Sequence, residues 1–489
     1  MLRAELSLDC TRSTTATLSH APQHGHGDGP TGWISSLTER LQSPANFLTA
    51  TVLFALAVRL IIVAIVFRNV SAPTFDHNEF GWEMGWTARS IALGRGFSSP
   101  FLPITGPTAL VPPLYPYLLA GIFKLFGLYT AASAVVILSL NSLFSALTCI
   151  PIYFSLLHPA GSRIARIAAF AWAIYPFSIY FSADRVWDYA ITAFLFAICF
   201  CAVQRLHLRG PWAWFAYGLL LGVTVLSNPS ALSILPFLIV FSLWKVHRVA
   251  GPWLRNGVIL LLACTALWAP WAIRNDRVLH TISTFRDGFW LEFYAGNNGD
   301  TSDSNPPAAH PASNPIEMQK YQSAGEIAYI DHKRVRSLNF VQHHRLFFVG
   351  VSLRRFVRFW TGFWSFRRVY LVLQPLDIPN VFFCLFLGIF MLRGLQRWWR
   401  DDPGSALPYL LTLLIFPIPY YLTHSSMDYR QPIEPVILSL VVIGIFGLQN
   451  DSSFSPLELE DESLVPELAS EEADEDPTPV TAMDLAAIS

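Results

Sequence analysis

The sequence predicts an all-α polytopic membrane protein, with about ten transmembrane helices and further juxtamembrane or re-entrant helices in its outer loops. Three observations favour this class. Hydrophobic residues make up 53% of the 489 residues, charged residues make up 14%, and the mean hydropathy is +0.41. Too few polar residues remain to cover a water-soluble surface. Apolar runs near the roughly 20 residues that cross a bilayer recur along the chain, and the basic residues lie between them.

Composition divides the chain into three parts. Residues 1–45 are polar, rich in small residues and without the apolar core of a signal peptide, so we expect a disordered cytoplasmic tail. Residues 46–448 carry the apolar runs and form the predicted transmembrane domain. Residues 449–489 are acidic and are expected to form a second disordered cytoplasmic tail.

Charge and cysteine content exclude several function classes. The formal net charge is -1, and no basic region in the sequence could neutralise the phosphates of a nucleic acid. The six cysteines form no disulfide or metal-binding pattern, and no HExxH or GxxxxGK[ST] motif occurs. The sequence therefore assigns no metal ligands and no certain cofactor, and it leaves the use of a divalent metal ion open.

Eleven apolar runs are candidate spans. They lie near 47–68, 112–127, 131–156, 164–182, 187–204, 211–226, 229–245, 256–274, 376–394, 405–422 and 432–448. Short loops that carry Lys and Arg stay on the cytoplasmic side. The basic groups at 163–166, 205–209, 245–255 and 393–400 can all do so only if one early run does not cross. The run at 112–127 is short and proline-rich, so we predict a re-entrant or interfacial helix there.

The predicted topology has ten spans in the plasma (inner) membrane and places both termini in the cytoplasm. Four segments then face the outer side. They are the loop at 69–130, a short segment at 182–189, the long loop at 275–375, and residues 423–431. Each carries acids, arginines or both.

The first outer loop gathers three acids, Asp76, Glu79 and Glu83. Residues Trp82 to Leu93 form a predicted amphipathic surface helix that ends at Gly94. If that helix reaches back to Glu79, both glutamates project from one face. Such carboxylates can act as a general base and a metal or substrate ligand. A solvated pair of surface acids fits the same spacing.

Asp188 lies at the mouth of a predicted span. An ionisable residue at that depth is costly unless it is paired or hydrated, so it is a candidate functional acid. The alternative is an acid that the dipole of the following helix favours, or an ion pair with Arg185.

Arginines mark the later outer segments. Arg430 enters the last span, where its planar fork suits a lipid phosphodiester or pyrophosphate. Arg354, Arg355 and Arg358 are predicted to share one helical face among aromatic residues, where they could rest on lipid and hold a phosphate. Simple anchoring at lipid headgroups is the alternative for each of them.

Several motifs occur in a characteristic order. They are A-R-x-x-A-x-G-x-G-F at Ala88–Phe97, then GPTA and PPLYPYLLAGIFKLFG, Asp188, PWxxRN at Pro270–Asn275, GNN at Gly296–Asn298, and YRxPIEP at Tyr429–Pro435. Together they resemble the C-type glycosyltransferases, and more narrowly the family-39-like members akin to protein O-mannosyltransferases and the lipid A aminoarabinose transferase. The resemblance covers most of residues 47–448.

The resemblance implies a C-type glycosyltransferase fold and a hexosyl- or pentosyltransferase that uses a polyprenyl-phosphate sugar. Transfer would go to an acceptor hydroxyl or other nucleophile on the extracytoplasmic face, usually with inversion. An acid of the first outer loop would be the base, because the lipid phosphate is already a leaving group that arginines can stabilise.

Carried onto this chain, the resemblance assigns roles to particular residues. The base is Glu83 or Glu79 with Asp76 third, Asp188 is the second functional acid, and Arg430 and Arg274 contact the donor phosphate. Further substrate-binding candidates are Tyr115, Asn275, Asn297, Arg358 and Tyr429.

Two departures from the family pattern weaken an aminoarabinose donor and disfavour the protein substrates of the eukaryotic mannosyltransferases. Val111 stands where the aminoarabinose enzymes carry a lysine, and the loop at 275–375 has no room for the large domain of the eukaryotic mannosyltransferases. The predicted partners are the lipid-linked donor, membrane lipids and an acceptor that is lipid, glycan or protein.

A polyprenyl-lipid or polysaccharide transporter is the alternative function, and a structural part of a cell-envelope assembly is a third. A transporter would place charges along a midplane pathway, whereas Arg59 is the one clear intramembrane charge in the sequence.

Overall fold

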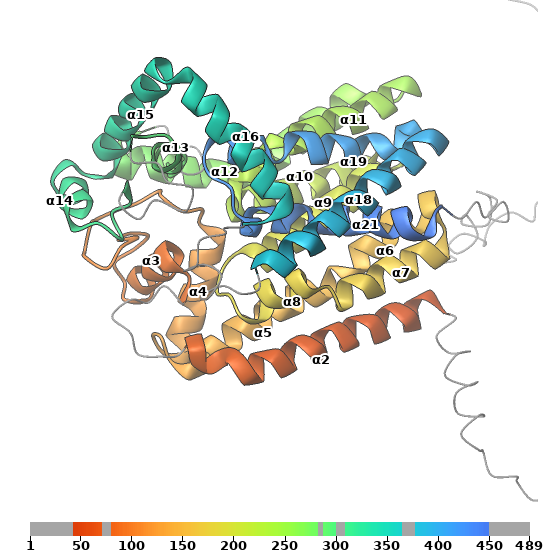
Figure 1. Cartoon of the computed structure of the whole chain (residues 1–489), viewed down its shortest axis with the longest axis horizontal. Coiled ribbons are helices and arrows are strands. Elements are labelled where there is room, and N and C mark those ends of the chain that lie inside the picture. The colour runs from red at the N-terminus through yellow and green to blue at the C-terminus, as the bar shows by residue number, and fades with distance from the viewer. Residues whose placement is uncertain (1–42, 71–79, 282–286, 300–308, 364–376, 449–489) are drawn as a thin grey trace, which may run out of the picture. The chain divides into compact units, whose positions relative to one another are not determined.

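The computed structural model describes residues 43–70, 80–281, 287–299, 309–363 and 377–448 (Figure 1). Their secondary structure is helical, with one isolated antiparallel bridge between Ser98 and Pro107. The all-α prediction is therefore confirmed for this part of the chain. Most of the predicted N-terminal tail and all of the C-terminal tail lie outside the described residues.

Helices make up most of the described residues. In chain order they are α2 (Pro44–Val70), α3 (Trp82–Ala92), α4 (Leu114–Phe126), α5 (Ala131–Leu147), α6 (Cys149–Ala160), α7 (Ser162–Ala173), α8 (Pro176–Ala183), α9 (Tyr189–Arg205), η2 (Leu206–Leu208), α10 (Pro211–Ser227), η3 (Pro229–Ser233), α11 (Leu235–Arg248), α12 (Trp253–Leu279), α13 (Phe289–Gly296), α14 (Pro315–Ala324), α15 (Glu326–His343), α16 (Arg345–Thr361), α18 (Asp377–Asp401), α19 (Pro403–Ile415), α20 (Ile418–Leu422), η5 (Met427–Ile433) and α21 (Glu434–Phe446).

Seven segments of the described chain are long and apolar enough to cross a membrane. They are Pro44–Val70, Ala131–Ala160, Tyr189–Leu208, Trp253–Leu279, Ile378–Asp401, Pro403–Leu422 and Met427–Phe446. The pair α7–α8 counts as an eighth if its 43° bend is one broken span. The two other predicted spans correspond to α10, with 17 residues, and α11, with 14 residues. Length and composition thus support a multi-pass membrane protein without confirming a count of ten.

The helix predicted to be re-entrant is α4. Its 13 residues extend about 20 Å, which is less than the roughly 30 Å of a bilayer core. It packs against α3 and α5 (Figure 1). Its length agrees with the prediction, and its depth in the membrane remains predicted.

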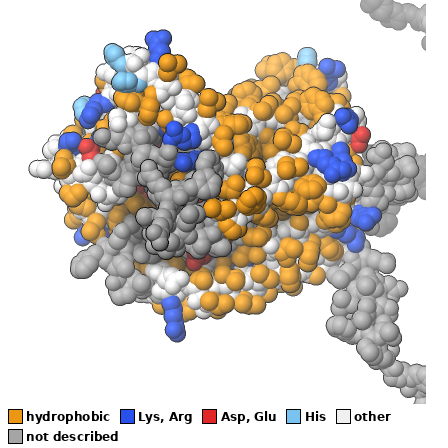
Figure 2. All heavy atoms as spheres, in the orientation of Figure 1, with side chains coloured by type: hydrophobic (Ala, Val, Ile, Leu, Met, Phe, Trp, Pro, Cys, Tyr) orange, Lys and Arg blue, Asp and Glu red, His pale blue; other side chains and the backbone are white. Residues whose placement is uncertain are grey.

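Large apolar side chains are exposed along several helices, and hydrophobic side chains cover much of the face shown in Figure 2. On α2 the exposed fraction is 62% for Ile61 and 70% for Ile65. Leu262 of α12 and Phe382 of α18 are similarly exposed. A surface of this kind is stable in lipid and costly in water.

Arg59 of α2 is fully buried and forms hydrogen bonds at the break between α7 and α8. Burial of a guanidinium requires partners for its N–H groups. Arg59 donates hydrogen bonds to the carbonyls of Trp172 (3.2 Å) and Ala173 (2.9 Å), where α7 ends, and to the hydroxyls of Ser145 (3.0 Å) and Ser178 (2.6 Å). Carbonyls at a helix C-terminus lack partners within the helix and attract a cation. The intramembrane charge is therefore part of the scaffold.

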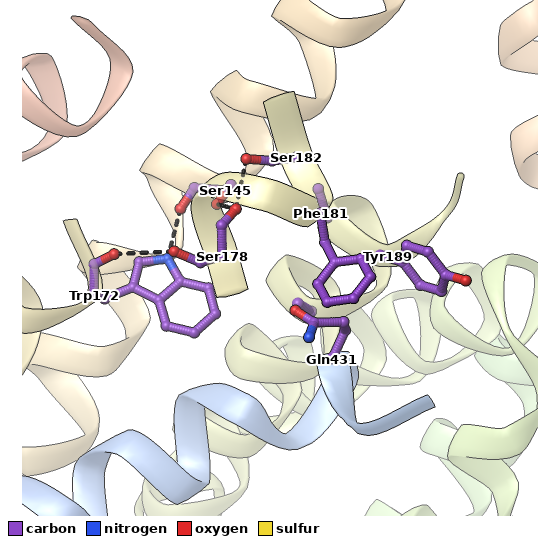
Figure 3. Close-up of a pocket in the computed structure, with 9 residues that line it drawn as sticks. Ser145, Trp172, Ser178, Phe181, Ser182, Tyr189 and Gln431 are labelled. Atoms are coloured by element: carbon purple, nitrogen blue, oxygen red, sulfur yellow. Dashed lines mark hydrogen bonds between the residues drawn. The ribbon is translucent and has the colours of Figure 1, made fainter. Parts of the chain in front are cut away.

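A small cavity adjoins this network, with room for about one water molecule (Figure 3). Its lining comes from α5, α7, α8, α9 and η5 and includes Ser145, Ser182, Phe181 and Tyr189. The side-chain amide of Gln431 also faces it (Figure 3), and the Nε2 atom is buried without a hydrogen-bond partner among the described residues. A cavity of this size is too small to be a route for a lipid or a sugar.

The segments predicted to face outward gather at one end of the long helices, where α3, α4, α13, α14 and α15 lie together (Figure 1, left). Apolar packing joins the first loop to the third, because Trp86 and Phe101 share a cluster with Leu291, Tyr321 and Tyr329. The two long outer segments thus lie together as predicted. Which side of the membrane this end faces remains a prediction.

Candidate active site

Glu83 and His310 form a carboxylate–imidazole pair at the start of α3. Glu83 Oε1 lies 3.2 Å from His310 Nε2. The imidazole contacts Trp82 and Phe101 edge to face, with ring centroids 6.2 Å and 5.7 Å apart. The two polar side chains keep 14% and 16% of their surface exposed. The pair is therefore largely shielded from solvent and still accessible to a small group.

The position of Glu83 follows from local geometry. Gly81 has a φ of 96°, a left-handed value that a residue with a side chain rarely adopts, and α3 begins directly after it. Glu83 thus occupies the first helical turn, where the helix dipole favours a negative charge. The predicted helix is confirmed over Trp82–Ala92, and its place at the membrane surface stays a prediction.

Helix α3 begins at Trp82, directly after the left-handed Gly81, so a common helical face for Glu79 and Glu83 stays a prediction. Asp76 and Glu79 themselves lie outside the described residues. Within the residues that the structure describes, no group of three His, Cys, Asp or Glu side chains could hold a metal ion. The structure therefore adds no support for a divalent metal.

Asp188 occupies the N-cap position of α9 and is 1% exposed. Its Oδ2 accepts hydrogen bonds from Asn228 Nδ2 (3.2 Å) and Thr192 Oγ1 (3.4 Å). This position agrees with the alternative in which the dipole of the following helix favours the acid. Arg185 donates a hydrogen bond from Nε to the Tyr180 hydroxyl at 3.0 Å, and its Nε lies 3.8 Å from Asp184 Oδ2.

Tyr115 is completely buried beneath the site. Its hydroxyl accepts a hydrogen bond from Asn141 Nδ2 at 3.0 Å, and Asn141 Nδ2 also donates to the carbonyl of Arg185 at 3.2 Å. These bonds connect α4 and α5 to the segment before Asp188. The structure thus gives Tyr115 a place in the core below the outer segments.

Arg430 is only 2% exposed, and protein groups surround its guanidinium. Its Nε donates to Glu434, whose other carboxylate oxygen accepts from the Tyr175 hydroxyl at 2.6 Å. Its Nη1 donates to the carbonyl of Trp360 at 3.2 Å, and the guanidinium lies 5.4 Å from the centre of the Phe177 ring. A buried charge with this set of partners fastens η5 and α21 to α16 and α8.

Arg274 holds the first outer loop onto α12. It donates hydrogen bonds to the carbonyls of Phe97 (2.6 Å) and Thr108 (2.7 Å) and to Asn275 Oδ1 (2.9 Å). Its guanidinium also lies 5.1 Å from the centre of the Trp271 ring. Asn275 is fully buried. The PWxxRN motif therefore holds the loop that carries Glu83 against α12 through hydrogen bonds.

Asn297 has a comparable role in the GNN motif. Its side-chain amide donates to the carbonyls of Phe293 and Leu422, each at 2.8 Å, and its oxygen accepts from Arg355 Nη1 at 3.2 Å. Arg355 also donates to the carbonyls of Gly296 and Leu422. These contacts bind α13, α16 and α20 into one unit.

The three arginines of α16 do not share a face. Arg355 is buried, Arg354 is exposed, and Arg358 is half-buried with its guanidinium 4.9 Å from the centre of the Phe363 ring. The prediction of a common face is wrong because neighbouring residues on a helix point about 100° apart. Arg358 and Arg354 are the members that a substrate could reach.

Tyr429 belongs to a second polar group. Its hydroxyl lies 2.6 Å from His424 Nε2, and His424 Nδ1 lies 3.5 Å from Glu292 Oε2. The Tyr429 ring stacks on Tyr420 with centroids 4.7 Å apart and planes 8° apart. Tyr429 is half-buried, so its hydroxyl stands at the edge of the folded unit.

Glu326, which the sequence analysis did not select, joins the GPTA motif to α15. Its carboxylate accepts hydrogen bonds from the backbone N–H of Ala109 (2.7 Å) and from the hydroxyls of Tyr321 (2.6 Å) and Thr108. Burial raises the pKa of Glu326, and these hydrogen bonds oppose that rise. Arg274 thus binds backbone carbonyls of the first outer loop, and Glu326 binds an N–H and a hydroxyl of the same loop.

His310, Glu292 and His424 were also missed. Each is a single polar residue in an aromatic or proline-rich outer segment, and none is part of a spacing motif. A search for isolated histidines in the outward segments would have found both imidazoles. Their carboxylate partners are remote in sequence, so no pattern could have paired them.

We expect acid to loosen the α14–α15 unit through Glu317. Burial raises the pKa of Glu317, but hydrogen bonds from Lys320, Lys333 and Tyr329 outweigh burial and lower the pKa from 4.5 to about 2. A lowered pKa means that the group stabilises the fold above 4.5 and loses that contribution as pH falls from 4.5 toward 2. In thermal unfolding, the wild type should therefore exceed Glu317→Gln in Tm near neutral pH, and the difference should shrink over this interval. A difference that stays constant with pH would contradict the assignment.

Comparison with known proteins gives a match for part of the chain. Residues 110–271 match the family model described as dolichyl-phosphate-mannose-protein mannosyltransferase. This match confirms the resemblance to mannosyltransferase-like membrane glycosyltransferases. It includes Asp188 and Tyr115 but not Glu83, Arg274 or Tyr429. A search of curated proteins found no match.

Solved structures of an archaeal oligosaccharyltransferase from Archaeoglobus fulgidus are similar at low identity. Its complex with zinc and sulfate is 13% identical with a TM-score of 0.46, over 80% of this chain and 48% of that chain. The form tethered to an acceptor peptide is 15% identical with a TM-score of 0.46, over 81% and 49%. The complex with an inhibitory peptide and dolichol-phosphate is 13% identical with a TM-score of 0.44, over 81% and 50%. The chain spans about half the length of these structures, and such TM-scores do not establish a shared fold.

Proposed function

We propose that this chain, part of which matches a mannosyltransferase family, transfers a sugar from a polyprenyl-phosphate donor to an acceptor nucleophile at the extracytoplasmic membrane surface. The reaction inverts the anomeric centre, and Glu83 is the base. The observation that supports this most is the Glu83–His310 pair, which is partly accessible and lies where the outer segments converge. The sugar is a hexose or a pentose, and the acceptor is a lipid, a glycan or a protein.

The chemistry requires one proton acceptor and a stabilised leaving group. Glu83 removes the proton of the acceptor hydroxyl as its oxygen forms a bond to the anomeric carbon. The bond between that carbon and the phosphate oxygen breaks, and the lipid phosphate leaves as an anion. A carboxylate can perform this step without a nucleotide cofactor because the phosphate already departs readily. His310 orients the carboxylate through its Nε2 contact.

The donor phosphate lies toward η5 and α16 in this proposal. Tyr429 and Arg358 are the predicted contacts that are half-buried and can reach a ligand. Arg430, Arg274 and Asn297 are engaged by protein groups and shape the site from below. Asp188 also shapes the site from below, because it lies at the start of α9. The next residue, Tyr189, donates a hydrogen bond from its hydroxyl to Asp428 Oδ2 at 3.1 Å.

The expected result is release of polyprenyl phosphate by the purified protein in liposomes. Polyprenyl-phosphate hexoses and pentoses are supplied with a membrane extract as the source of acceptor, and lipid products are separated by chromatography. Asp331→Asn serves as a control, since Asp331 is 56% exposed and pairs with Arg334 on the surface. Movement of the donor lipid between leaflets without any release would support a transporter and overturn the proposal.

A further inference from the structure

Three ionisable or hydroxyl side chains from separate segments meet beside the proposed donor site. Glu292 comes from α13, His424 follows α20, and Tyr429 lies in η5. His424 contacts both others through opposite ring nitrogens, with 3.5 Å from Nδ1 to Glu292 Oε2 and 2.6 Å from Nε2 to the Tyr429 oxygen. The order is that of a carboxylate–imidazole–hydroxyl relay.

The protein fixes this arrangement from two sides. Arg355 Nη1 donates to the carbonyl of Leu422 at 3.0 Å, and Asn297 donates to the same carbonyl at 2.8 Å, so α13 and α20 cannot separate freely. Parallel stacking on Tyr420 holds the ring of Tyr429 in place. Glu292 keeps 28% and His424 keeps 20% of its side-chain surface exposed. The group is therefore organised, yet it stays close to solvent.

The expected behaviour of the group follows from its charges. His424 forms an ion pair with Glu292 when both of its ring nitrogens carry protons. The protonated Nε2 then donates to the Tyr429 oxygen, which leaves the phenolic O–H directed to another acceptor. A hydrogen bond from a charged imidazole polarises the hydroxyl that accepts it, so this O–H becomes a stronger donor than an isolated phenol. A departing phosphate is the acceptor that gains most, because its charge grows as the sugar leaves.

We propose that Glu292 and His424 are positioning residues that orient and polarise the Tyr429 hydroxyl as a hydrogen-bond donor to the leaving phosphate of the donor lipid. The inference rests on the proposed glycosyltransferase function. No proton is transferred by the relay, and no bond other than those of the sugar transfer is broken. Glu83 on the acceptor side and Tyr429 on the phosphate side then serve the two ends of the displacement.

A double-mutant cycle tests the relay, with initial rates of polyprenyl phosphate release as the readout. Tyr429→Phe should lower kcat about 100-fold, as expected for loss of one donor to a developing charge, with a smaller change in KM. His424→Ala and Glu292→Gln should each lower kcat about tenfold. In the Tyr429→Phe background, His424→Ala should change kcat less than about twofold, because its effect passes through the missing hydroxyl.

Tyr421→Phe is the matched control, because it removes a neighbouring hydroxyl that accepts a hydrogen bond from Trp360 Nε1 at 2.8 Å. It should retain nearly full kcat. If His424→Ala costs the same factor with and without the Tyr429 hydroxyl, His424 is merely structural and the inference is overturned. If all three single variants keep full kcat in an active enzyme, the inference fails while the proposed function stands. If the wild type releases no polyprenyl phosphate, both the inference and the proposed function are overturned.

Discussion

Glu83→Gln should slow polyprenyl phosphate release about a thousandfold, within the range of 10²–10⁴ that general base catalysis contributes. Gln has nearly the same shape and can still contact His310 Nε2, so the fold of α3 should survive. It has no negative charge and cannot accept the proton of an attacking hydroxyl. The loss should therefore appear in kcat and not in KM, as measured by initial rates at several donor concentrations.

Two comparisons make this result interpretable. Asp331→Asn makes the same chemical change at an exposed acid paired with Arg334, and it should leave kcat unchanged. Full activity in Glu83→Gln would move the base to Asp76 or Glu79. Full activity in all three single variants would remove the outer-loop carboxylate as the base.

Arg59→Leu should cause the largest loss of stability in the chain, about 3–5 kcal/mol. The substitution removes the donors that satisfy the terminal carbonyls of α7 and the hydroxyls of Ser145 and Ser178. Those acceptors lie where no bulk water can replace the lost partner. Thermal unfolding of the detergent-purified protein, followed by intrinsic fluorescence, should show a large fall in Tm.

Arg68 provides the control for this effect, since it lies on the same helix and is exposed. Arg68→Leu should leave Tm nearly unchanged. Arg59→Lys should recover only part of the loss, because an ammonium cannot reproduce the fork of a guanidinium that binds five groups at once. Equal Tm values for Arg59→Leu and Arg68→Leu would show that the buried network does not stabilise the break between α7 and α8.

The charge at Arg59 also bears on the choice between enzyme and transporter. Intramembrane charges commonly mark substrate pathways. Here the guanidinium is fully buried and bonded to the end of α7, and the adjoining cavity holds about one water molecule. The intramembrane charge at Arg59 therefore has a structural explanation, and it lends no support to a transport route.

Local sequence features determined much of what the structure contains. Apolar runs predicted many of the helices, and the amphipathic pattern from Trp82 to Leu93 before Gly94 predicted α3. They failed where one residue changed the backbone direction. The sequence from about Ile316 to Gln342 predicts one long helix, whereas the structure has α14 and α15, because Gly325 adopts a φ of 78° between them. A single glycine in a helical pattern does not reveal its own dihedral angle.

Residue type alone did not determine which charged side chains are accessible. Arg430 and Arg274 were chosen as phosphate contacts because an arginine fork suits a phosphate, and the structure shows each engaged by protein acceptors. Most of those acceptors are backbone carbonyls of distant segments, and sequence spacing carries no information about them. Only the Arg430–Glu434 pair has an i,i+4 spacing that the sequence shows. Burial of an arginine depends on the segments that pack around it.

The sequence by itself determined the class of the protein, the helices, the outer segments and the acid of α3 as a candidate base, because hydropathy and backbone preferences act over short stretches of chain. The tertiary structure decided the partners. It set His310 beside Glu83, His424 between Glu292 and Tyr429, and Arg59 at the end of α7. Except for His424 and Tyr429, which are five residues apart, these contacts join residues far apart in the chain, and they exist only once packing has brought separate helices together.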